Sequence, residues 1–182
     1  MASPNRIGEI AGVAAAICIL SFSFAAAQRS LQKQLGPEYK KWLTEDVRWI
    51  IRDEERRDFW KLVTDDQRRE FVDEFWARRN PSPKSQENPF KEEHYRRLAY
   101  ANEHFAAAVA GRKTDRGRIY IVYGPPDTVR SIAGDGQKYP SEVWHYNHMK
   151  GGGDDVSLEF VDTCWCGEYP IATEPPNREW DK

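Results

Sequence analysis

Two spacings of apolar residues divide this chain into a first half that predicts helices and a second half that predicts strands. Between residues 37 and 110, apolar side chains recur every three or four positions, which is the period of an amphipathic helix. From residue 118 onward they alternate or run together, as in strands. We therefore expect an α+β fold, in which three or four helices pack on a small, mainly antiparallel sheet.

Local signals mark the ends of the expected helices. Pro37 suits the first turn of a helix, and Asp53, followed by two glutamates, suits an N-cap. Thr64 and Gln67 have the spacing of a capping box, and Asn88 precedes a proline, as at many helix starts. The expected helices cover residues 37–50, 53–63, 65–79 and 88–110.

The change of pattern falls within residues 111–127. Gly111 follows the long helical pattern and suits the left-handed position after a helix. An apolar run of β-branched and aromatic residues, 118–123, predicts a strand that ends before Pro125 and Pro126, since proline donates no ladder hydrogen bond. The next segments alternate and are separated by a glycine-rich turn, which predicts a hairpin. The further strands expected are 142–147, 156–161 and 169–172, and residues 128–132 form either a short strand or a turn.

The first 27 residues have the pattern of a secretory signal. Arg6 precedes an apolar run, and three alanines end it, so we expect cleavage after Ala27. The stretch 7–27 is also nearly long enough to remain as a membrane anchor. Either outcome predicts an exported protein, periplasmic or extracellular. The expected organisation is a signal at 1–27, a flexible leader at 28–36, one domain at 37–174 and a frayed tail at 175–182.

Composition narrows the possible partners. The net charge is −2 with 31% charged residues, and this lacks the basic excess that nucleic-acid binding needs. The chain has seven tryptophans. Some of these rings must form the core, and any that stay exposed are candidates for a binding surface.

Four blocks along the chain resemble the GWxTD domain family of exported bacterial proteins. The central block reads Gly111-Arg112-Lys113-Thr114-Asp115, and the others lie at residues 75–83, 94–102 and 123–127. Arg112 stands where the family motif has tryptophan. The resemblance implies an exported or periplasmic domain, and it brings no established biochemical activity with it.

The cysteines of the expected domain leave several alternatives open. Cys164 and Cys166 flank one residue, and in an oxidising compartment they could form a disulfide, bond to another chain or remain thiols. His145 and His148 lie on the neighbouring expected strand. If the hairpin aligned all four side chains, they would supply the nitrogen and sulfur ligands of a zinc site.

Acid–base chemistry also has candidate residues. Asp115, Arg116, Asp127, Glu142 and His145 could gather at one end of the sheet, and a carboxylate beside a histidine is the usual pair for proton transfer. The two aspartates could equally fix turns through backbone hydrogen bonds. The sequence has no nucleophile elbow, phosphate loop or metalloprotease helix motif.

We therefore expect a non-catalytic module that binds a protein or an envelope component through the hairpin of Trp144 and the turn with two prolines. It would need no cofactor, bind no nucleic acid and touch a membrane only through an uncleaved N-terminal segment. The alternative is a hydrolase or metal-dependent enzyme that uses the region of His145, Cys164 and Cys166. The candidate binding residues are Thr114, Asp115, Arg116, Tyr123, Asp127, Trp144 and His145.

Overall fold

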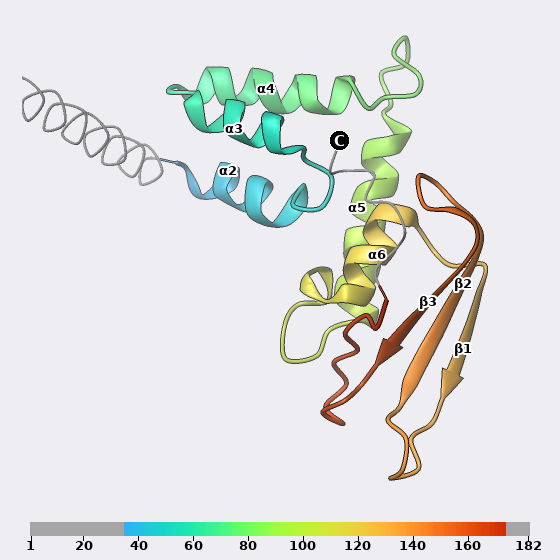
Figure 1. The fold of residues 1–182 in the computed structure, drawn as a ribbon. Helices are drawn as coiled ribbons and strands as arrows, with labels where there is room; N and C mark the ends of the chain where they lie inside the picture. Colours follow the sequence, from blue (N-terminus) through green and yellow to red (C-terminus); the bar gives the residue numbers. More distant parts are fainter. Residues whose placement is uncertain (1–34, 174–182) are drawn as a thin grey trace, which may run out of the picture. The chain divides into compact units, whose positions relative to one another are not determined.

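A computed structural model describes residues 35–173 (Figure 1). The expected signal, most of the expected leader and the expected tail lie outside the described residues. The chain divides into two compact units, residues 1–40 and 41–182, and the contacts below are all within the second. None of the helices in the described range has the length and apolar content needed to cross a membrane.

The described residues form helices followed by a three-stranded antiparallel sheet, so the α+β class is confirmed. A short 3-10 turn, η2, lies between the last two helices. In chain order, the elements are α2 (Pro37–Lys41), the π-helical turn η1 (Trp42–Asp46), α3 (Asp53–Lys61), α4 (Asp65–Ala77), α5 (Pro89–His104), η2 (Gly111–Lys113), α6 (Asp115–Tyr123), β1 (Thr128–Ile132), β2 (Ser141–Met149) and β3 (Gly153–Val161).

Two of the expected helix starts are confirmed by their caps. The hydroxyl of Thr64 accepts the N–H of Gln67, whose side chain accepts the N–H of Thr64 in return. The Asn88 side chain accepts the N–H of Lys91 at the start of α5. The start of α3 differs by one residue, because the N-cap is Arg52 and not Asp53. The first expected helix is shorter than predicted, and it continues as the π-helical turn η1.

The strand predicted at 118–123 is wrong, since these residues form most of α6. Thr114 caps the start of this helix, and Gly124, at a φ of 92°, ends it. Every residue from Arg116 to Ile121 is buried. Helices that are buried all round lose the polar stripe that reveals their period, so a short run of β-branched and aromatic residues reads as a strand.

The helix predicted at 88–110 ends early, at His104. The chain then turns back so that Gly111 lies against the carbonyl oxygen of Ala101. The N–H of Arg112 also donates to the side chain of Asn102 at 3.1 Å. The expectation of a left-handed conformation at Gly111 is wrong, because this glycine serves a close approach of two backbone segments and its φ is not positive.

The sheet has the order β1-β2-β3, and both neighbouring pairs are antiparallel, as expected for the hairpin. Trp144 on β2 lies between Val129 of β1 and Leu158 of β3. The strand expected at 169–172 is reduced to one bridge, between Phe160 and Ile171, on the outer edge of β3.

The helix–sheet core lies between α5, α6 and one face of the sheet, as Figure 1 shows. Its twelve buried members come from these elements and the residues that border them: Leu98, Ala101, Phe105, Ile119, Tyr120, Ile121, Trp144, Tyr146, Met149, Val156, Leu158 and Phe160. A second group of rings, from η1, α3 and α4, packs Trp42 against Phe59 and Phe75 with centroids about 5 Å apart. Both groups place their rings at separations where aromatic pairs attract.

Candidate functional site

Thr114 and Asp115, two of the predicted binding residues, lie at the N-terminus of α6, where their side chains form hydrogen bonds that stabilise the fold. The Thr114 hydroxyl donates to the carbonyl of Gly111 at 2.8 Å and accepts the N–H of Gly117 at 3.1 Å. Asp115 accepts the N–H of Ile171 at 3.0 Å and the guanidinium of Arg118 at 3.3 Å. Together these bonds cap α6 and hold the C-terminal segment against it.

Arg116 ties α6 to the sheet. Its guanidinium donates to Glu142 at 2.9 Å and to the carbonyl of Gly167 at 3.3 Å, and it lies 4.1 Å above the centre of the Tyr169 ring. Glu142 in turn accepts the indole N–H of Trp144 at 3.0 Å. This ion pair is largely buried, so removing either partner would leave a charge with little solvent.

Two glycines of this segment allow backbone segments to touch. A Cβ at Gly111 would lie 1.8 Å from the carbonyl oxygen of Ala101, and one at Gly117 would lie 1.8 Å from the carbonyl oxygen of Gly111. These distances are far below any real contact of a Cβ with backbone. The absence of a side chain at Gly111 and Gly117 therefore allows α5, η2 and α6 to pack closely.

Position 112 joins three elements in a different way. The Arg112 guanidinium donates to Glu45 at 2.7 Å and to Asn102 at 3.3 Å, and its carbonyl accepts the indole N–H of Trp49 at 2.8 Å. Arg112 thus links η2 to η1 through an ion pair and to α5 through a hydrogen bond.

Of the other predicted site residues, Trp144 joins this group through its hydrogen bond to Glu142, and Asp127 and His145 make contacts elsewhere on the sheet. Asp127, which precedes β1, accepts the N–H of Asn147 on β2 at 2.7 Å. Tyr123 is the last residue of α6 and is half-buried. His145 faces Ser157 and Asn147, at 3.2 Å from each. Trp144 is only 2% exposed and is a core residue, so its ring offers no surface to a partner.

The four candidate metal ligands are not brought together. Cys164 and Cys166 form a disulfide just beyond the end of β3. His148 pairs with Asp154 at the opposite, turn end of the same hairpin, and His145 lies between the two ends. The register of the hairpin therefore separates the histidines from the sulfurs along the strands.

The contacts described above bring the sequence block at 111–115 against the block at 94–102. A family model described as the GWxTD domain matches residues 27–164, most of the chain. The chain belongs to the GWxTD domain family. Comparisons with curated proteins and with solved structures found no match.

This GWxTD domain has a shallow cleft beside its motif. The cleft encloses about 220 Å³, and the wall contributed by α6 and η2 carries Lys113, Thr114 and Asp115. Glu168 and Tyr169 form the opposite wall. The oxygens of Thr114 and Asp115 accept hydrogen bonds from backbone N–H groups, so these two cleft residues have structural roles.

An exposed aromatic pair, Tyr139 and Trp165, lies at the open end of the hairpin. Their rings are 50% and 53% exposed, with centroids 6.4 Å apart. Trp165 lies over Gly134, where a Cβ would meet its ring at 2.3 Å. This pair was not predicted from the sequence, although a tryptophan between two cysteines just after a predicted strand is a usable signal.

The loop that carries Trp165 is rigidly held. The disulfide joins the residues on either side of it, and Trp165 itself has a φ of 56°, which is unusual for a bulky residue. Burial alone would raise the pKa of Asp162, but N–H groups of this loop, first Gly167 and then Cys166, bond to its carboxylate and lower the pKa.

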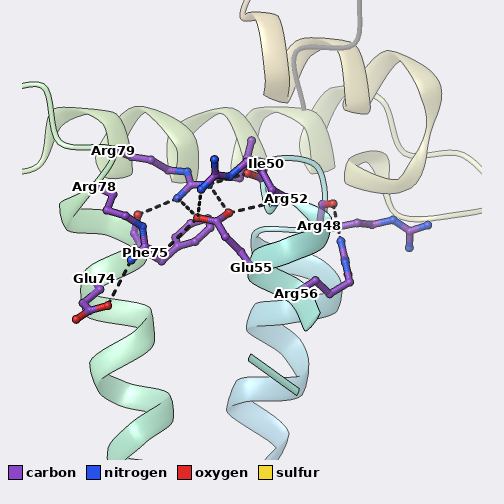
Figure 2. A network of polar contacts seen from close by, with 9 residues as sticks. All are labelled: Arg48, Ile50, Arg52, Glu55, Arg56, Glu74, Phe75, Arg78 and Arg79. Carbon is purple, nitrogen blue, oxygen red and sulfur yellow. Dashed lines mark hydrogen bonds and ion pairs between the residues drawn. The ribbon is translucent and has the colours of Figure 1, made fainter. Parts of the chain in front are cut away.

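A second missed feature is a buried carboxylate, Glu55, in the first turn of α3 (Figure 2). The guanidinium of Arg79 donates to both of its oxygens, at 3.0 and 2.7 Å. Burial alone would raise the pKa of Glu55, but the hydrogen bonds from Arg79 and from the N–H of Arg52 lower it to about 2. Glu55 lies four residues before Phe59, which places it on the apolar stripe of α3.

Proposed function

We propose that this GWxTD domain is an exported, non-catalytic binding module whose contact surface is the aromatic pair Tyr139 and Trp165. The observation that carries the proposal is the exposed, left-handed Trp165 on a disulfide-braced loop. An unfavourable backbone conformation costs on the order of 1–3 kcal/mol and persists where the surroundings impose it, commonly at functional sites. A disulfide also suits an oxidising compartment outside the cytoplasm.

Both rings have the properties of interface anchors. Tyrosine and tryptophan offer a large contact area with few rotatable bonds, and they are enriched among the residues that dominate binding energy. Gly134 supports one ring of the pair from below, so Trp165 loses little conformational freedom when a partner covers it. The expected partner is a protein or an envelope component, the same class of partner that the sequence predicts for the hairpin of Trp144.

The polar residues around α6 favour binding over catalysis. Thr114, Asp115 and Arg116 each hydrogen-bond to groups of the fold. Catalysis at Cys164 or Cys166 would require a free thiolate, whereas both sulfurs are in the disulfide. Tyr139 and Trp165, in contrast, are not members of the helix–sheet core.

The test compares capture from an envelope extract of the native bacterium by the immobilised protein and by Trp165→Ala and Tyr139→Ala. Val63→Ala is the matched control, because Val63 is 61% exposed and lies between α3 and α4. We expect one component to bind the parent protein and the control but not the aromatic variants, while all four unfold at the same temperature. Equal capture by all four would refute the aromatic surface.

A further inference from the structure

We propose a binding site for a phosphate group between Arg52 and Arg78, built over the buried pair of Glu55 and Arg79. This site is separate from the aromatic pair and does not depend on it. Figure 2 shows Glu55 between the two outer arginines, one reaching it from the start of α3 and the other from the end of α4. The proposal follows from how the charges of this network are distributed.

Arg79 alone neutralises Glu55. Its two terminal nitrogens contact the two carboxylate oxygens in the bidentate geometry that carboxylates and guanidinium groups prefer. The same guanidinium donates to the carbonyls of Ile50 and Phe75 and lies 3.6 Å above the Phe75 ring centre. It is thereby fixed in place as the inner member of the network.

Arg52 and Arg78 add positive charge that Glu55 no longer balances. Their terminal nitrogens lie 3.5 and 3.3 Å from the same oxygen of Glu55, so the two guanidinium groups are neighbours. Both side chains remain about half exposed. Arg78 also has a 3.4 Å contact with Glu74, which is itself exposed and therefore a weak partner.

The surroundings strengthen this positive field. Among the described residues, neither Arg48 nor Arg56 has a carboxylate partner; Arg56 donates to the carbonyl of Arg48. Asp53 and Glu54 follow Arg52 on α3 and offset part of the charge, although Glu54 is paired with Arg57 at 3.3 Å. Among the residues labelled in Figure 2, arginines outnumber glutamates.

A phosphate group fits this arrangement better than a carboxylate does. Two adjacent guanidinium forks present several N–H donors from different directions, which suits a tetrahedral group with up to two negative charges. A buried carboxylate below holds both forks at the surface, so they need little rearrangement to bind. The phosphate could be free in solution or part of a lipid headgroup, and the experiment separates these sources.

The first arm titrates the protein with inorganic phosphate at constant ionic strength and follows the side-chain N–H signals of Arg52 and Arg78 by NMR. We expect saturable shifts, and binding at least about tenfold weaker for the double variant Arg52→Gln/Arg78→Gln, which loses both charge-assisted contacts. Lys61→Gln and Arg69→Gln are matched controls on α3 and α4, because each is an exposed basic residue in a local ion pair. They should bind phosphate like the parent protein.

The second arm measures binding to vesicles of phosphatidylglycerol and of phosphatidylcholine. Saturable binding of free phosphate supports a soluble ligand; binding only to the anionic vesicles, lost in the double variant, supports a headgroup. The variants keep Glu55 and Arg79, so an unchanged urea midpoint verifies that they fold. Absence of both kinds of binding, or equal binding by parent and double variant, would overturn the site.

Discussion

Replacing Glu55 by glutamine removes the buried negative charge that pairs with Arg79. The pKa of Glu55 is about 2 in the folded chain against an ordinary value of 4.5. That difference corresponds to about 3 kcal/mol of folding free energy at pH 7, and the loss of one partner from a buried pair costs about the same. We therefore expect Glu55→Gln to lower the free energy of unfolding by about 3 kcal/mol at neutral pH.

The pH dependence has a definite sign. Because the pKa of Glu55 is lower in the folded chain, the unfolded chain takes up a proton first as the pH falls. The stabilisation from this residue is complete above its ordinary pKa of 4.5 and is lost as the pH falls toward 2. The stability gap between parent and variant should shrink to less than about half its neutral value by pH 3.

Urea unfolding at pH 7, 5 and 3, followed by fluorescence, measures this gap. Glu74→Gln is the control, since Glu74 is exposed and belongs to the same network; it should change stability by less than about 0.5 kcal/mol. A stability gap below about 1 kcal/mol at pH 7, or a gap that does not narrow at pH 3, would refute the reasoning.

Two further predictions concern packing. Gly111→Ala and Gly117→Ala should each destabilise the protein by about 3 kcal/mol or more, since the new Cβ would overlap a carbonyl oxygen. Gly136→Asn meets no neighbouring atom and carries only the strain of its φ of 84°, so it should cost less in the same thermal unfolding measurement. Trp144→Ala should cost about 3–5 kcal/mol in urea unfolding because it empties the centre of the core, and a cost below about 1 kcal/mol would show that the ring is dispensable for folding.

Local signals with a direct physical cause were predictable from the sequence. The caps at Thr64 and Asn88 form within four residues, and the turn between β2 and β3 pairs Met149 with Gly153, four positions later. The α+β class followed from two clear periods. The structure of residues 118–123 was not predictable in this way. Their β propensity predicts a strand, but they form a helix that is buried on all sides by tertiary packing.

The candidate site was less predictable, because its residues meet through tertiary contacts. The sequence contains an alternating charge run at residues 53–58 that is typical of a solvated face, yet one of these charges, Glu55, is buried. Its partner Arg79 lies 24 positions away. The burial of Trp144 and the exposure of Trp165 likewise depend on where α5 and α6 cover the sheet, and no residue type encodes that.

The two edges of the sheet differ in a way that limits self-association. On the outer side of β3, the N–H of Val161 donates to Pro170 and the N–H of Ala172 donates to Glu159, so the C-terminal end of that edge is covered. In the described part of the chain, β1 has β2 as its only strand neighbour, so its other edge can accept a strand. Two copies that pair through their β1 strands use that edge on both molecules and form a closed dimer. A fibre would also need the edge of β3, where residues 170–172 already cover the C-terminal end.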